Sequence, residues 1–201
     1  MQTKIRAINP DGNEEDVKST VGGAVYSADM ARIWTAKGYG WQVMATSAVA
    51  SLTIRPTNLS IATFYNNTAK NFIIERVFTH NLVSIADGNF SIWLCVHPIG
   101  MTAPTNDITV RNSLSGLTAG TEGIFDNAAT VVDNGWFPWG AWGTTVTASM
   151  PGTVQEAEIA GRIVIPPTAA ISLSAVGQTA AVTHCMGLTY YSVPLTEYTL
   201  E

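Results

Sequence analysis

Residues 90–97 read Phe-Ser-Ile-Trp-Leu-Cys-Val-His, and this stretch decides the fold. Phe90, Ile92, Leu94 and Val96 alternate with a second set of residues that includes the polar Ser91. Successive side chains of a β-strand point to opposite faces, so a period of two predicts a strand with one face in the core.

The same alternation recurs along most of the chain. Turn residues separate the segments, as in Pro56-Thr57-Asn58, Asn66-Asn67 and Pro166-Pro167. Short alternating runs with turn signals between them predict an all-β, antiparallel sandwich or barrel. The only helix we expect is a turn or two within residues 28–37. The further alternating segments are residues 52–55, 59–65, 72–79, 163–165, 171–175 and 182–191.

The length of 201 residues fits one domain with an arm. Residues 1–20 are polar, acidic and rich in turn residues, and we expect a flexible arm that either frays or becomes ordered on a neighbouring subunit. Residues 21–201 would form a single β-sandwich. Within it, residues 100–161 are rich in Gly, Asn, Pro and Thr, with only short strand candidates such as residues 108–110 and 145–147. This composition predicts a loop-rich insertion on one side of the sandwich.

The composition excludes several classes of protein. Only 12% of the residues are charged, against about 25% in ordinary domains, while 46% are hydrophobic. Disordered chains show the opposite balance. Acidic residues outnumber basic ones by 15 to 10, which argues against nucleic-acid binding. No apolar run is long enough for a membrane helix. So few charges favour a surface that is buried in an assembly, or an extracellular β-rich module.

Two further features bear on the cellular compartment. Cys95 and Cys185 are too few for a disulfide framework. The N-terminal residues lack the apolar stretch of a secretory signal, so we expect synthesis in a cytoplasm.

The sequence shows no catalytic motif, and we expect no enzyme activity, no catalytic residues, no cofactor and no metal. The strongest chemical alternative is a metal site at Cys95 and His97, which share a strand face, together with either His184 or Cys185. These residues supply at most three ligands, whereas a closed structural zinc site takes four. The pattern therefore favours buried cysteines and packed histidines.

Residues 134–143 read Asn-Gly-Trp-Phe-Pro-Trp-Gly-Ala-Trp-Gly, and their glycines and proline predict a loop. So much apolar surface would not remain bare in water. The loop could fold back over its own domain, dock on another subunit or stack on sugar rings. The interface or ligand-contact candidates are Trp136, Phe137, Trp139 and Trp142.

Five segments of the chain carry a resemblance to known proteins: residues 59–67, 72–78, 163–167, 170–175 and 187–195. They resemble capsid-associated jelly-roll proteins of tailed phages, the decoration, cement and head-fibre type. The resemblance implies an antiparallel jelly-roll-like β-sandwich and a homotrimer. It also implies a non-enzymatic virion protein that stabilises the head through contacts with its own copies and with the major capsid protein, without nucleic acid or membrane partners.

Two alternatives remain open. The first is a tail, spike or fibre module that uses the tryptophan-rich segment to bind host glycans. The second is an enzyme on a jelly roll that uses a metal held by Cys95, His97 and His184.

Overall fold

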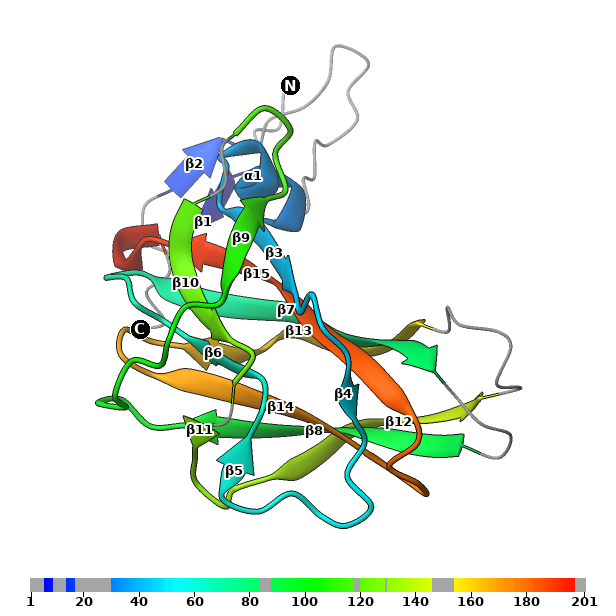
Figure 1. Cartoon of the computed structure of the whole chain (residues 1–201). Coiled ribbons are helices and arrows are strands. Elements are labelled where there is room, and N and C mark those ends of the chain that lie inside the picture. Colours follow the sequence, from blue (N-terminus) through cyan, green and yellow to red (C-terminus); the bar gives the residue numbers. More distant parts are fainter. Residues whose placement is uncertain are drawn as a thin grey trace.

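One continuous antiparallel sheet of eleven strands folds into two layers, the two sheets of a sandwich, and forms the body of the protein, as the computed structural model shows (Figure 1). The structure describes residues 6–8, 14–16, 30–83, 88–117, 120–128, 130–145 and 154–197. One sheet has the order β3 (Gly40–Met44), β15 (Thr183–Val193), β7 (Asn71–Val83) and β13 (Val154–Ile165). The other has the order β6 (Thr63–Tyr65), β14 (Ala170–Gly177), β8 (Gly88–His97) and β12 (Phe137–Thr145).

In this strand order, strands from the end of the chain lie between strands from its first half. The last strand, β15, pairs between β3 and β7, and β14 pairs between β6 and β8. Each sheet therefore combines early and late strands, as in the two Greek keys of a jelly roll. The all-β, jelly-roll-like sandwich expected from the sequence is confirmed.

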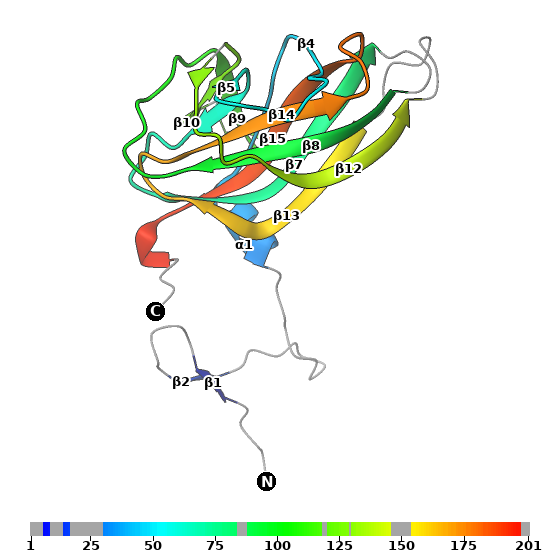
Figure 2. The ribbon, with the colours of Figure 1, turned by 90° about the horizontal axis from the view of Figure 1, so that it is seen from below.

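Both sides of the sandwich are closed. On one side, β9 (Ile108–Asn112) pairs with β3, and β10 (Gly120–Asp126) pairs with β6 and β9. On the other side β12 lies against β13, so closely that a Cβ on Gly140 would lie 3.0 Å from the Cβ of Ala157 (Figure 2). The molecule is therefore barrel-like, with its core between the two sheets.

Aromatic rings fill the middle of the core. Phe64, Phe72 and Tyr190 are buried, and their ring centroids lie 4.7–5.5 Å apart. Gly123 interrupts the register of β10 with a φ of 121°, and a Cβ there would lie 2.5 Å from Cε2 of Phe64. Only glycine suits this backbone and leaves space for the ring. The Tyr190 hydroxyl donates a hydrogen bond to the carbonyl oxygen of Glu122.

The expectation of loops for residues 100–161 was wrong over four strands, whereas the short strand expected at residues 108–110 is present as β9. This segment contains β9, β10, β11 (Thr130–Val131), β12 and most of β13. β12 pairs with β8, with Phe137 opposite Leu94 and Pro138 opposite Trp93. β12 contains two glycines and a proline, which are turn signals, so the sequence pattern did not predict a strand here. Proline is tolerated there because β12 has a ladder partner on one side only.

Of two further predictions from the sequence, the short helix is confirmed and the strand at residues 52–55 is wrong. The expected helical turns are present as α1 (Met30–Ala36). The strand expected at residues 52–55 was wrong, because only Leu52 forms an isolated bridge, with Val176. The remaining elements are β4 (Val49–Ala50), which pairs with β15, β5 (Leu59–Ser60), which pairs with β11, and the 3-10 helix η1 (Leu195–Glu197).

Two short strands lie within the predicted arm. β1 (Arg6–Ile8) and β2 (Glu14–Asp16) pair only with each other and lie apart from the sandwich (Figure 2). The other residues of the predicted arm, 1–5, 9–13 and 17–20, are outside the described residues. The arm's flexibility stays a prediction.

Candidate functional site

Trp136 folds back onto its own domain. It is 4% exposed and packs with Cys95 and Val132 on the outer face of the β8 sheet. Its Nε1 donates to the carbonyl oxygen of Thr57, and its own carbonyl oxygen accepts a bond of 3.4 Å from Arg55 Nη2. Of the three possibilities for the tryptophan-rich segment, this residue follows the first.

The next residue, Phe137, is not buried as Trp136 is, and its apolar ring is exposed to water. It is 62% exposed, and its ring meets the Trp139 ring edge-on, with centroids 6.3 Å apart. Trp139 is half-buried against the main core, and the Arg162 guanidinium lies over its ring, 5.5 Å from the centroid. We call Phe137, Trp139 and Arg162 the aromatic edge, where β12 meets β13.

The loop that contains Arg55 is hydrogen-bonded to the segment before Phe137. Ile54 is 69% exposed, and it precedes Arg55, which hydrogen-bonds to the segment just before Phe137. Arg55 Nη1 donates to Asn134 Oδ1 at 2.7 Å, and Nη2 donates to the Asn134 carbonyl oxygen at 3.0 Å.

Three of the four predicted contact residues therefore divide between two environments. Trp136 is buried, whereas Phe137 and Trp139 lie together at the aromatic edge. Trp142 also belongs to β12, but its side chain is outside the described part. Sequence reasoning missed Arg55 and Arg162. No local signal could have found them, because each lies more than 20 residues from the tryptophan that it contacts.

A chain of polar side chains crosses the outer face of the same sheet. His97 Nε2 lies 2.8 Å from Ser172 Oγ, which in turn lies 3.0 Å from Thr63 Oγ1. His97 Nδ1 lies 3.9 Å from an Asp133 carboxylate oxygen and 3.8 Å from Cys95 Sγ. The shared face of Cys95 and His97 is as predicted.

This arrangement holds a serine, a histidine and an aspartate, but their exposure is the reverse of a hydrolase triad. Ser172 is 0% exposed, whereas the Asp133 side chain is 67% exposed. In a serine hydrolase the serine meets the substrate and the aspartate is buried. Burial also raises the pKa of the Cys95 thiol and lowers the pKa of His97, which disfavours a thiolate–imidazolium pair. These contacts therefore hold the segment of residues 132–136 against the outer face of the sheet.

His184 does not join this cluster. It lies on β15, in the other sheet, opposite Asn81 and Val49 in the register. Among the residues that the structure describes, no group of three or more His, Cys, Asp or Glu side chains could hold a metal ion.

Acid should destabilise the protein through His184. Burial lowers its pKa to about 4, against about 6.5 in an unfolded chain. Between these values the unfolded chain takes up the proton and the folded chain does not. The free energy of unfolding therefore falls as the pH drops from about 6.5 to 4, by on the order of 3 kcal/mol from this residue. Urea unfolding at a series of pH values measures this loss.

The control is His184→Gln, which cannot titrate. The variant should show a shallower fall in stability between pH 6.5 and pH 4 than the parent. Equal slopes for the two proteins would contradict the assignment. His97 contributes in the same direction in both proteins, because burial also lowers its pKa.

Comparison with known proteins adds no assignment. No protein-family model matches the chain, and no curated protein matches it. No helix in the described residues is long and apolar enough to cross a membrane.

Proposed function

We propose that the chain is a non-enzymatic structural protein of a virion, a decoration or cement protein that assembles as a homotrimer on the head of a tailed phage. The observation that carries this proposal is the aromatic edge, where Phe137 exposes most of its ring. Aromatic residues of this kind dominate the energy of protein–protein contacts.

Assembly would work by burying this apolar surface. Burying a side chain such as Phe or Leu contributes about 1.5–3 kcal/mol. A chain with only 12% charged residues has few ionised groups to desolvate when its surface meets another protein. Several such contacts at each subunit junction would raise the free energy needed to separate the capsid subunits. The described residues expose further large apolar side chains at Ile54, Leu59, Val96 and Ile99.

The geometry favours a protein partner over a glycan at this edge. A sugar-stacking tryptophan presents an open ring face, but Trp139 packs against the core and has Arg162 over its ring. Phe137 meets Trp139 edge-on, at an interplanar angle of 73°, so the two rings do not form one flat platform. We therefore place the glycan-binding module second.

Co-sedimentation with tailed-phage heads stripped of decoration proteins tests the capsid part of the proposal. The wild-type chain should pellet with the heads and raise the temperature at which they release DNA, and Phe137→Asp should do neither. Wild-type protein that stays in the supernatant and leaves the release temperature unchanged would overturn the capsid assignment.

A further inference from the structure

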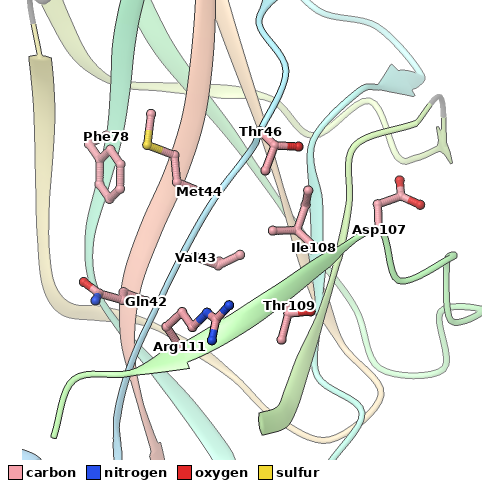
Figure 3. Close-up of a pocket in the computed structure, with 9 residues that line it drawn as sticks. All are labelled: Gln42, Val43, Met44, Thr46, Phe78, Asp107, Ile108, Thr109 and Arg111. Atoms are coloured by element: carbon pink, nitrogen blue, oxygen red, sulfur yellow. The ribbon is translucent and has the colours of Figure 1, made fainter. Parts of the chain in front are cut away.

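The outer face of the sheet formed by β3, β15, β7 and β13 carries an apolar hollow. Met44 and Phe78 lie side by side at its centre, and each is opposite Gly187 of β15 in the register (Figure 3). Val154, the first residue of β13, completes the apolar part and is 52% exposed. We call this site the β7 hollow. Its volume is about 300 Å³, and its polar rim includes Arg76, His80 and Glu156.

Gly187 lets the floor of this hollow form. A Cβ on Gly187 would lie 2.6 Å from Cζ of Phe78 and 2.6 Å from the carbonyl oxygen of Val43. Because glycine has no Cβ, the Phe78 ring lies down against the β15 backbone instead of standing off the sheet. The apolar floor is therefore in place before a partner binds, which lowers the entropy cost of binding.

A homotrimer needs a surface that receives Phe137. Subunits around a threefold axis meet through two different patches of the same chain, since only a twofold axis brings identical patches together. The aromatic edge is one half of such a contact. It lies too far from the β7 hollow of its own chain to fill it, because Arg162 and Glu156 are six residues apart on β13, roughly 15–20 Å in an extended strand.

The aromatic edge brings two unpaired cations with it. Arg162 covers the Trp139 ring and donates to the backbone carbonyl oxygens of Glu158 and Ile159. Arg55 donates to backbone oxygens of the segment just before Phe137. Neither guanidinium forms an ion pair with a carboxylate among the described residues. The edge is therefore an apolar ring with positive charge beside it.

The β7 hollow offers the opposite charge. Glu158 is opposite Arg76 in the register, and opposite residues of an antiparallel pair share a face, so Glu158 lies beside the hollow. Arg76 is already paired with Glu156, at 3.1 Å. The exposed Glu158 carboxylate has no basic partner in the part of the chain that the structure describes. It is therefore available to a cation from another chain.

The neighbouring groove between β3 and β9 suits the aromatic edge less well. It is larger, at about 600 Å³, and its β9 side carries Arg111 (Figure 3). Arg111 would repel the arginines of the aromatic edge, and like charges brought together across an interface are unfavourable. Charge therefore favours the β7 hollow as the receiving surface.

We propose that the β7 hollow of one chain receives Phe137 of the next chain around the threefold axis, with Glu158 beside the arginines of the incoming aromatic edge. This inference rests on the proposed homotrimer and names the surface that completes its contact. The Phe137 ring is the anchor, and Met44, Phe78 and Val154 are the apolar surface that covers it.

Two variants that each lack one half of the contact test this pairing. Phe137→Asp removes the ring and keeps the hollow, whereas Val154→Asp places a carboxylate in the hollow and keeps the ring. Each full-length chain alone should remain a monomer where the parent chain is a trimer. Mixed at high concentration, with one chain mass-tagged, they should form a heterodimer, because one intact ring meets one intact hollow and no closed ring can follow. Native mass spectrometry identifies this species.

The outcomes separate this inference from the proposed function. A Val154→Asp chain that assembles as the parent does would show that Phe137 meets another surface, which overturns the inference and leaves the proposed function standing. Failure of the mixed chains to form the heterodimer also overturns it. A parent chain that stays monomeric overturns the homotrimer and this inference together. Both substituted side chains are exposed, and circular dichroism checks that each variant folds.

Glu158→Lys tests the charge contact separately. The substitution places a cation against the two arginines of the incoming edge, so it should weaken association of the parent chain by about tenfold. Leu117→Asp, an exposed change in the turn after β9, is the control and should leave association as it is. Unchanged association for Glu158→Lys would place the arginines elsewhere and overturn the proposed pairing.

Discussion

Replacing Trp136 by alanine should lower the free energy of unfolding by about 3–5 kcal/mol, the usual cost of removing a buried aromatic side chain. The ring is 4% exposed and packs with Cys95 and Val132. The variant also loses the Nε1 hydrogen bond to Thr57. Equilibrium unfolding in urea, with the m-value compared to detect a change in the unfolded state, measures this loss.

The matched control is the adjacent aromatic residue. Phe137→Ala should change the free energy of unfolding by no more than about 0.5 kcal/mol, measured at concentrations where the chain is dissociated, because an exposed side chain contributes little to folding. A Trp136→Ala loss below about 1 kcal/mol, or an equal loss for both variants, would contradict the division between the buried and the exposed aromatic residue.

Replacing Phe137 by aspartate should weaken self-association by about 100-fold or more. The variant loses an apolar contact worth about 1.5–3 kcal/mol. It also places a carboxylate in the interface, and removing that charge from water adds a desolvation cost. Each 1.4 kcal/mol corresponds to a factor of ten in the dissociation constant. Sedimentation velocity over a concentration series measures the change.

Leu117→Asp supplies the control for this variant. Leu117 is also a large exposed apolar residue, but it lies in the turn after β9, away from the aromatic edge. Its association should match that of the parent chain. If both aspartate variants weaken association equally, any added negative charge on the surface has this effect and the aromatic edge has no special role.

The sequence predicted the strands whose alternation is strong. β8, β14 and β15 place alternate residues in the core, and this periodicity is local information. β7 follows the rule at Phe72 and Ile74 but changes face at a register shift, so that Val77 is buried and Arg76 is exposed. The shared face of Cys95 and His97 followed from the same rule. Its limits are visible at residues 52–55, where Leu52 and Ile54 alternate correctly but find no strand to pair with, and Ile54 stays exposed.

What could not be predicted depends on distant partners. β12 is a strand because β8 offers its edge, and Gly140 fits because Ala157 lies against it. The opposite fates of Trp136 and Phe137 depend on Thr57 and Arg55, about 80 residues earlier in the chain. Likewise, Ser172 and Asp133 reach His97 only through the jelly-roll topology.

The native mass of the purified chain tests the central claim most directly. Light scattering coupled to size-exclusion chromatography, over a range of concentrations, should give an assembly of three chains of 21.4 kDa each. This assembly should dissociate on dilution, and dissociate at higher concentration when Phe137 is aspartate. A particle that keeps the mass of one chain at every concentration would contradict the account.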